Sequence, residues 1–162
     1  MVERLWAPWR LEYLLAPKPE GCVFCLARDG EPETSKLVLR RYERCFVILN
    51  KYPYTNGHLM VVPNAHCDDL VGVDDETLLD MGRVSRRCLS ALRACMRPEG
   101  FNLGYNLGSA AGAGIDEHLH FHIVPRWNGD TNFMAVLADT RVISEHLTAT
   151  MQKLSLALEA QA

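Results

Sequence analysis

The chain has 162 residues, which corresponds to a single domain with or without a tail. Its apolar fraction of 48% and its charged fraction of 23% are typical of globular proteins and exclude the disordered and fibrous classes. The 17 Lys and Arg residues against 20 Asp and Glu residues give a formal charge of −3, which disfavours broad electrostatic binding of nucleic acid.

The sequence contains no segment with the length and composition of a membrane helix. The longest apolar run, residues 59–62, is far shorter than the ~20 residues that cross a bilayer. Residues 1–15 contain Trp, Pro and Glu where a signal peptide would be continuously apolar. We therefore expect a cytoplasmic protein with no membrane partner, in which the six cysteines are reduced.

The first third of the chain predicts an arm followed by a hairpin. Residues 1–21 are rich in Trp, Arg and Pro, so we expect an ordered N-terminal arm. Residues 46–49 and 58–62 have strand composition, and the segment between them contains a Pro and an Asn-Gly turn. This pattern indicates a hairpin with a long loop.

Two helices are expected in the remainder of the chain. Residues 75–97 carry apolar residues at spacings of three and four, which is the pattern of an amphipathic helix. Asp74 is a suitable N-cap for this helix, and the sequence Pro98-Glu99-Gly100 should end it. The final helix is expected at residues 141–160.

Further strand patterns lie between these helices. Residues 101–108 alternate between an apolar face and a face of Asn and Gly that would let a ligand approach closely. A loop rich in Gly and Ala, residues 109–114, leads to a strand at residues 118–124. Strands in meander order with two main helices indicate an α+β domain on an antiparallel sheet of about five strands. The expected apolar face of the strand at residues 101–108 consists of Phe101, Leu103, Tyr105 and Leu107.

Three of the six histidines lie within five residues, in the segment His118-Leu119-His120-Phe121-His122. Alternate residues of a strand face the same way, so the three histidines would share one face while the apolar residues between them enter the core. A strand with a merely polar outer face would not need this concentration of imidazoles. The segment therefore indicates a functional site.

Two kinds of chemistry fit the three histidines. One is a metal centre, because His-x-His on a strand can supply two ligands to one ion. The two ends of the segment are about 13 Å apart at ~3.3 Å per residue, however, so a single ion cannot bind all three. The other is nucleophilic catalysis, because a neutral imidazole is a good nucleophile toward phosphorus. Backbone N–H groups around Gly112 and Gly114 would then receive a phosphate anion.

The segment from His118 to Val124 closely resembles the signature of the histidine triad family, in which His-x-His-x-His is followed by two apolar residues. Further motifs extend the resemblance over nearly the whole chain. They are similar to a bacterial branch of the family, the diadenosine tetraphosphate phosphorylases (ATP adenylyltransferases). These motifs are Leu5-Trp6-Ala7-Pro8-Trp9-Arg10, Cys22-x-x-Cys25, Asn50-Lys51-Tyr52-Pro53-Tyr54, Gly57-His58-Leu59-Met60-Val61-Val62-Pro63, Gly100-Phe101-Asn102 and the run from Ala111 to Met134.

The resemblance implies an α+β fold, a homodimer and nucleotidyl transfer through a covalent histidine intermediate. By motif position, His120 would attack the α-phosphorus of a dinucleoside polyphosphate, and water or phosphate would then release the product. His118 and His122 would orient the nucleophile and steady the phosphate. His58 would lie near the phosphates, and Asn50 would bind the ribose.

The loop before the triad departs from the family pattern. Many relatives carry a Gln or a hydroxyl residue there, whereas this chain has Gly112-Ala113-Gly114-Ile115. Backbone N–H groups of Gly112 and Gly114, or Ser109, would have to replace that contact, with Asn106 on the adjoining small polar face. The departure leaves the preferred acceptor, phosphate or water, open.

Cys22 and Cys25 are separated by two residues, a spacing that lets both sulfurs bind one Zn²⁺. A complete structural site needs two more ligands, for which His66 and His118 are the candidates, with Cys67 as a weaker substitute. Some zinc-containing members of the family's wider superfamily use such a set of two Cys and two His. We expect structural zinc and no redox cofactor, and the alternative is a pair of small buried cysteines near the arm.

The leading hypothesis is a homodimeric enzyme that cleaves dinucleoside polyphosphates at the α-phosphate. One alternative is a metal-dependent hydrolase in which His118 and His120 hold a catalytic ion. Another is a non-catalytic protein that binds adenine nucleotides. The expected organisation is an arm at residues 1–21, a histidine triad domain at 22–140 and a C-terminal helix and tail at 141–162, packed on the domain or at the dimer contact.

Overall fold

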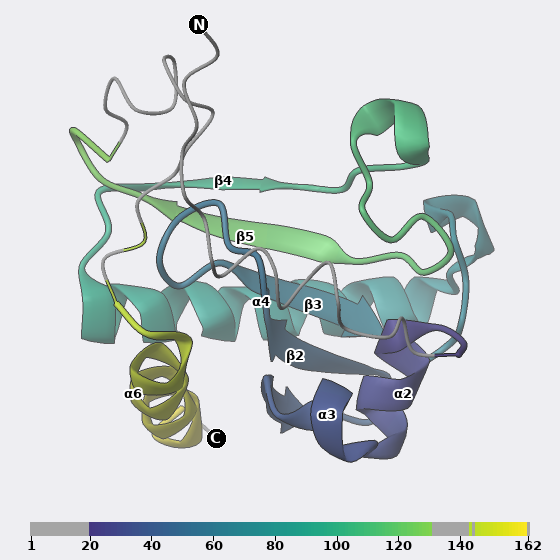
Figure 1. The fold of residues 1–162 in the computed structure, drawn as a ribbon, viewed down its shortest axis with the longest axis horizontal. Helices are drawn as coiled ribbons and strands as arrows, with labels where there is room; N and C mark the ends of the chain where they lie inside the picture. Colours follow the sequence, from purple (N-terminus) through teal and green to yellow (C-terminus); the bar gives the residue numbers. More distant parts are fainter. Residues whose placement is uncertain (1–19, 131–142, 144, 162) are drawn as a thin grey trace, which may run out of the picture.

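The computed structural model describes residues 20–130, 143 and 145–161, so nearly all of the predicted arm lies outside the described residues. This part of the chain has the expected α+β architecture around a five-stranded antiparallel sheet (Figure 1). The strand order is β1-β2-β3-β5-β4, so the last two strands are not in the predicted meander order. The strands are β1 (Val38–Arg41), β2 (Cys45–Leu49), β3 (Leu59–Pro63), β4 (Gly100–Gly104) and β5 (Phe121–Arg126).

Four helices accompany the sheet in the described residues. The two main helices that the sequence predicts are α4 (Asp75–Met96) and α6 (Leu147–Glu159). Two shorter ones, α2 (Val23–Asp29) and α3 (Pro32–Ser35), precede the sheet. Single 3-10 turns, η1 (Leu70–Gly72) and η2 (Ser109–Ala111), lie in the connections.

Helix α4 confirms the predicted helix and its N-cap. The Asp74 carboxylate accepts a hydrogen bond from the Thr77 backbone N–H at 2.9 Å, which satisfies one of the unpaired donors of the first turn. Arg97 takes the left-handed conformation with φ 51°, a common way for a helix to end, before the predicted Pro98. The helix therefore begins and ends where its cap residues predict.

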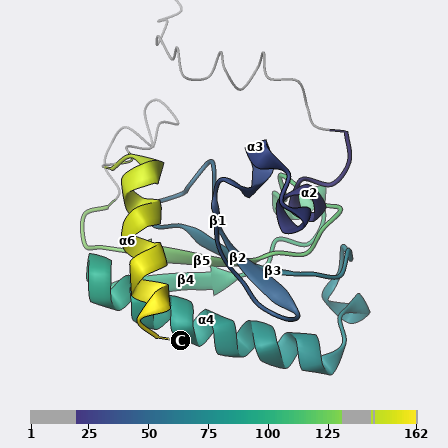
Figure 2. The same cartoon turned by 90° about the horizontal axis from the view of Figure 1, so that it is seen from below.

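The larger core cluster lies between the sheet and the two main helices. Alternate residues of β2, β3 and β5 pack there against buried residues such as Leu92 of α4 and Leu154 of α6. Figure 2 shows α4 running along the sheet with α6 packed across it. Helix α6 therefore packs on α4, and it begins at Leu147, later than the predicted residue 141. Of the predicted first residues, 141–142 and 144 lie outside the described residues.

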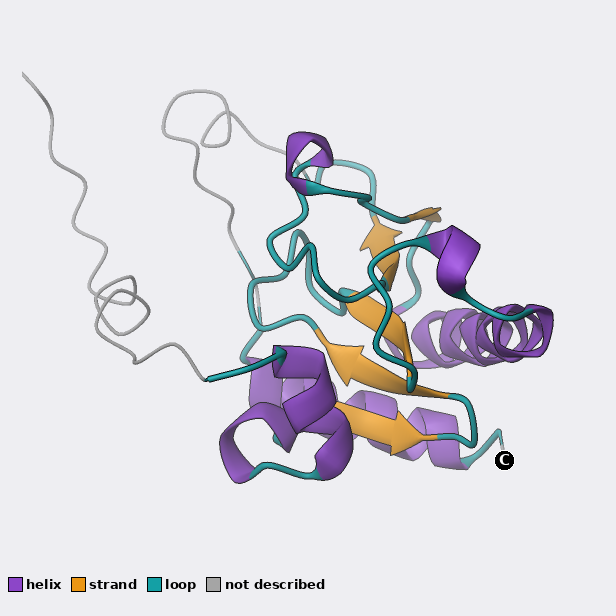
Figure 3. Ribbon diagram, turned by 90° about the vertical axis from the view of Figure 1, so that its right-hand side faces the viewer, coloured by secondary structure: helices purple, strands orange, loops and turns teal. Residues whose placement is uncertain are grey.

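A smaller core cluster covers the opposite face of the sheet. Phe24 of α2 packs there with strand residues that include Met60 of β3. Figure 3 shows the strands between the α2–α3 pair on one side and α4, seen end-on, on the other. His122 is the direct partner of Met60 across β3 and β5, so its side chain belongs to the α2 side of the sheet.

The predicted hairpin is confirmed by the antiparallel pairing of β2 with β3. The strand predicted at residues 118–124 begins later, at Phe121. The backbone N–H of Leu119 donates to the carbonyl oxygen of Cys67 at 2.6 Å instead of joining the sheet. The first two histidines of the triad therefore precede β5 rather than lie on it.

The predicted apolar face of β4 is wrong at two positions. Leu103 and Leu107 are 48% and 43% exposed, although Phe101 and Tyr105 do pack against the larger core. The strand also ends at Gly104, earlier than expected. Because β4 lies at the edge of the sheet, no other element among the described residues covers part of its apolar side.

Among the described residues, none of the helices combines the length and apolarity that crossing a bilayer requires.

Candidate functional site

The β2–β3 loop fixes one histidine of the site. The backbone N–H of Asn50 donates to the carbonyl oxygen of His58 at 2.9 Å and closes the loop. Gly57 has a φ of 77°, and a Cβ atom there would lie 2.7 Å from Met96 Sδ. Only glycine fits this turn without strain, so the local sequence determines how His58, fully buried, enters β3.

A hydrogen-bond network connects His58 with β5. Nε2 of His58 lies 2.9 Å from Nδ1 of His122. On its other side, Nδ1 of His58 accepts the backbone N–H of Tyr54 at 3.1 Å and lies 3.3 Å from Asn50 Nδ2. The Tyr54 ring lies against both imidazoles, with centroid distances of 4.6 Å to His58 and 5.9 Å to His122. The structure thus brings three predicted site residues into one network.

His120 stands beside this network and is 6% exposed. Its ring centroid is 4.7 Å from that of His122 and 5.0 Å from that of Phe24. Nδ1 of His120 lies 2.8 Å from the carbonyl oxygen of His118, which can only accept, so Nδ1 carries the proton and donates. Nε2 of a neutral His120 is therefore the nitrogen that keeps its lone pair.

Burial lowers the pKa of all three triad histidines. Desolvation, with a smaller contribution from neighbouring His120, lowers the pKa of His122 to about 4. Desolvation is also the main cause that lowers the pKa of His118 and of His120, partly offset by their hydrogen bonds to backbone carbonyls. The site therefore favours neutral imidazoles at pH 7.

The four predicted metal ligands meet at one point, because Cys22, Cys25, His66 and His118 offer ligand atoms that all lie within 4.8 Å of one another. Nδ1 of His118 is 3.2 Å from Cys22 Sγ and 3.3 Å from His66 Nδ1. Cys25 Sγ is 3.4 Å from His66 Nδ1. Bonds of ~2.0 Å to nitrogen and ~2.3 Å to sulfur put the ligand atoms of a tetrahedral zinc about 3.3–3.8 Å apart. The Cys/His cluster therefore has nearly the dimensions of a zinc site.

The two ring nitrogens of His118 have different partners, and together they direct Nδ1 toward the Cys/His cluster. Nε2 lies 3.0 Å from the carbonyl oxygen of Pro63 and donates to it, which leaves Nδ1 without a proton and directed at the cysteines. The cluster joins the start of α2, the segment after β3 and the segment before β5. His118 thus lies between the metal ligands and His120, whose Nδ1 it holds through its carbonyl oxygen.

The other predicted substrate-binding residues follow β4. Pairing of β4 with β5 ends at Gly104, opposite His122, and Asn106 lies two residues further along the chain. Ser109 begins η2, and Gly112 ends it in the left-handed conformation with φ 84°. The substrate-binding role of Asn106, Ser109, Gly112 and Gly114 stays a prediction.

Sequence reasoning missed three contributions to the site. The backbone N–H of Tyr54 and the carbonyl oxygen of Pro63 each hold a histidine nitrogen, and backbone groups leave no trace in residue type. The Phe24 ring packs against His118 as well as His120. Its position between the two cysteines was a usable signal, because the cysteines place that segment beside the triad.

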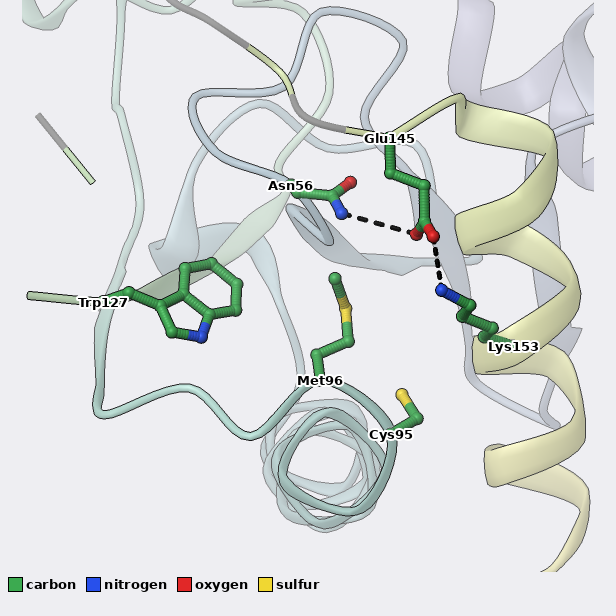
Figure 4. A pocket seen from close by; sticks show the side chains of 6 residues that line it. All are labelled: Asn56, Cys95, Met96, Trp127, Glu145 and Lys153. Carbon is green, nitrogen blue, oxygen red and sulfur yellow. Dashed lines mark hydrogen bonds and ion pairs between the residues drawn. The ribbon is translucent and has the colours of Figure 1, made fainter. Parts of the chain in front are cut away.

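A separate pocket of about 350 Å³ lies on the α4 side of the sheet, near the ends of α4 and α6 (Figure 4). Glu145 binds Lys153 and also accepts from Asn56 Nδ2 at 3.4 Å. The two charged residues that line this pocket are thus paired with each other and leave no net charge for a phosphate. The candidate site remains the group of histidines on the other side of the sheet.

A comparison with known protein families identifies the family of this chain. A family model described as the HIT domain matches residues 31–129, more than half of the chain and all three triad histidines. The chain belongs to the HIT domain family. The resemblance that its motifs indicate is confirmed.

A HIT relative from Mycobacterium tuberculosis is named AP-4-A phosphorylase. It is 35% identical over an aligned length of 162 positions, and the alignment covers 95% of this chain and 83% of the relative. A solved structure described as a Zn-bound histidine triad family protein, from Mycobacterium smegmatis, is 31% identical with a TM-score of 0.70 and covers 86% of this chain and 94% of its own. A histidine triad nucleotide-binding protein from Sulfolobus tokodaii, 26% identical, also has a TM-score of 0.70 and covers 86% of this chain and 93% of its own.

Proposed function

We propose that this HIT protein transfers a nucleotidyl group from a dinucleoside polyphosphate through a covalent bond to His120. The observation that carries the proposal is the hydrogen bond from His120 Nδ1 to the His118 carbonyl oxygen, which leaves Nε2 with its lone pair. The similarity to the relative named AP-4-A phosphorylase supports the substrate class. The small residues of the Gly112–Gly114 loop support an anionic ligand beside the triad.

In the first step, Nε2 of His120 attacks the α-phosphorus. An N–P bond forms while the bond from phosphorus to the bridging oxygen breaks. From diadenosine tetraphosphate the leaving group is ATP, and an adenylyl group stays on His120. His122, next to the nucleophile and held by His58 at 2.9 Å, would contact a phosphate oxygen, where low exposure to water strengthens the interaction.

In the second step, an acceptor oxygen attacks the same phosphorus and the N–P bond breaks, which restores His120. Phosphate as the acceptor gives ADP, and water gives AMP. The name of the Mycobacterium tuberculosis relative favours phosphate. Phosphorolysis of diadenosine tetraphosphate therefore gives ADP and ATP.

We also propose that the Cys/His cluster holds a structural zinc ion. Its donor set of two Cys and two His and its dimensions fit tetrahedral zinc. The Zn-bound HIT structure from Mycobacterium smegmatis supports the same ion here. When bound, zinc would supply a cross-link between α2 and the two segments that carry His66 and His118.

The geometry disfavours the alternative of a catalytic ion shared by His118 and His120. Nδ1 of His118 faces the cysteines and Nε2 donates to Pro63, so neither nitrogen is left for such an ion. The other alternative, a protein that binds adenine nucleotides without catalysis, would keep the same network. Such a binding protein would differ only in that it keeps its function when His120 is replaced.

We propose a homodimer joined at the β4 edge of the sheet. β4 lies at one end of the strand order, and Leu103, at its end, and Leu107, just beyond it, are exposed. A second copy would pair with the open strand edge and cover both leucines.

We also propose a domain at residues 22–140, within which the family model covers residues 31–129.

Product analysis tests the proposed function. We would incubate the protein with diadenosine tetraphosphate, with and without phosphate, and compare wild type with His120→Asn. We expect ADP and ATP from wild type, and a folded His120→Asn variant without turnover, because the covalent route is lost. The control is His146→Asn, which replaces the exposed histidine at the start of α6 and should leave turnover unchanged. Undiminished turnover by His120→Asn would overturn the proposal, and nucleotide binding without turnover by wild type would favour the non-catalytic alternative.

A further inference from the structure

The orientation of the Asn50 side chain is set by the loop that it begins. Its Oδ1 accepts the backbone N–H of Tyr52 at 2.9 Å. The other end of the amide, Nδ2, therefore faces Nδ1 of His58 at 3.3 Å. Because an amide nitrogen can only donate, Asn50 directs an N–H group at this imidazole nitrogen.

The same nitrogen of His58 receives a second donor. The backbone N–H of Tyr54 points at Nδ1 from 3.1 Å. A nitrogen that faces two N–H groups must carry the lone pair, so the single proton of the neutral ring is on Nε2. Nε2 lies 2.9 Å from Nδ1 of His122 and donates to it.

The tautomer of His122 follows from that of His58. Nδ1 of His122 accepts, so its proton is on Nε2. This Nε2 atom is buried and has no hydrogen-bond partner among the described residues. A buried donor without a partner is costly and calls for a function, and its ring lies beside that of the nucleophile, His120.

We propose that Asn50 is a positioning residue that, together with the Tyr54 backbone N–H, fixes the tautomers of His58 and His122, so that His122 presents an N–H group to a phosphate oxygen at the reaction centre. The inference rests on the proposed function for the identity of the substrate. It assigns Asn50 a task other than the ribose contact that the family resemblance implies. The task excludes an acceptor at the position of Nδ2, whereas a ribose contact can be made by a donor or an acceptor.

Two substitutions separate a donor role from a packing role. Asn50→Asp keeps the size of the side chain and the acceptor for Tyr52, but places an acceptor where Nδ2 donates. The lone pair of His58 Nδ1 would then face a carboxylate oxygen. A charge-assisted hydrogen bond to that carboxylate is stronger than the neutral bond from the Tyr54 N–H, so the proton would move to Nδ1. His58 Nε2 would become the acceptor, His122 would donate from Nδ1, and Nε2 of His122 would face the substrate without a proton. Asn50→Ala removes the side-chain donor, while the Tyr54 N–H still holds the original tautomer.

The direct measurement is a side-chain ¹H–¹⁵N correlation spectrum of the full ¹⁵N-labelled chain, which distinguishes the two imidazole tautomers. We expect both His58 and His122 to carry the proton on Nε2 in wild type and in Asn50→Ala. In Asn50→Asp both should carry it on Nδ1. A wild-type spectrum with His122 protonated on Nδ1 overturns the inference by itself, even should a variant fail to fold. Unchanged tautomers in a folded Asn50→Asp variant overturn it equally.

Kinetics provide the second readout. Asn50→Asp should lower kcat by about 10²-fold, the scale of a misplaced proton donor, with little change in KM. Asn50→Ala should lower kcat less, although it removes more atoms. The reverse order, or a change confined to KM, overturns the relay and supports packing or ribose binding. The spectra do not depend on turnover, so a wild type that fails to cleave dinucleoside polyphosphates would refute the proposed function and leave the tautomers to decide this inference.

Discussion

Burial and hydrogen bonding together decide which form of each histidine faces the reaction centre. His118 and His120 each direct one ring N–H to a backbone carbonyl, and His122 receives its hydrogen bond from His58. Under the proposed function, these contacts would divide the triad into a residue that serves the Cys/His cluster, a nucleophile and a donor toward substrate. The sequence identifies the three histidines of the triad. The different roles of these histidines depend on backbone groups such as the Pro63 carbonyl, which no residue pattern reveals.

The low pKa of His122 predicts a loss of stability in mild acid. The folded-state pKa is about 4 and the ordinary value is 6.5, so between these pH values the unfolded chain binds a proton that the folded chain excludes. The contribution is fully present above pH 6.5 and is lost as the pH falls toward 4, approaching ~3.5 kcal/mol at ~1.4 kcal/mol per pKa unit. The neighbouring groups are the His58, His120 and Tyr54 rings.

Denaturant unfolding of wild type and His122→Asn across this pH range measures the effect. The difference in unfolding free energy between the two should shrink as the pH falls from 6.5 to 4, because the variant lacks the titrating ring. Parallel stability curves for the two proteins would mean that His122 does not titrate as described.

Local patterns predicted the long elements and missed the short ones. Helix α4 shows a sustained apolar period and a capping Asp74, and the β2–β3 hairpin has two apolar runs around a turn. Strand β1 has four residues, of which only Val38 is buried, and the N-cap residue of α2, Cys22, makes no side-chain capping hydrogen bond. These elements owe their form to tertiary packing, chiefly of Phe24 against the sheet and of the Cys/His cluster.

The cluster predicts that zinc stabilises the α2 side of the molecule. Metal analysis of the purified protein should find about one zinc per chain. Removal of the zinc with a chelator should lower Tm by roughly 5–10 °C, because α2 loses its link to the segments after β3 and before β5.

The Cys25→Ser variant should show the same loss of zinc and the same lower Tm. Cys67→Ser, which changes a cysteine next to His66 but outside the cluster, is the control and should keep both the zinc and the Tm. Protein that lacks zinc and melts at an unchanged temperature would refute a structural ion.

At the scale of the whole molecule, the sheet separates two regions of different character. The histidine network and the Cys/His cluster lie toward α2, while α4 and α6 bury the larger core on the other face. The α+β class and the sheet of five strands could be predicted, because each element needs an apolar partner layer. The strand order and the exposure of Leu103 could not, since both depend on which strand ends at the edge of the sheet.

The exposed edge predicts how the proposed dimer could be broken. Leu103→Lys should convert the protein from a dimer to a monomer in light scattering coupled to gel filtration, because a charge at the strand edge opposes pairing. Val71→Lys is the control: it replaces a side chain that is 92% exposed on η1, and the variant should remain dimeric. A wild-type monomer, or a dimeric Leu103→Lys variant, would exclude the β4 edge as the contact.

The proposed covalent intermediate can be tested directly. The wild-type protein would be mixed with diadenosine tetraphosphate labelled in the adenine, quenched within the first turnovers, digested and mapped by mass spectrometry. We expect one adenylyl group on the peptide that contains residues 118–122, bound to His120, and none in the His120→Asn variant. An adenylyl group on another residue, or none while products accumulate, would contradict nucleophilic catalysis by His120.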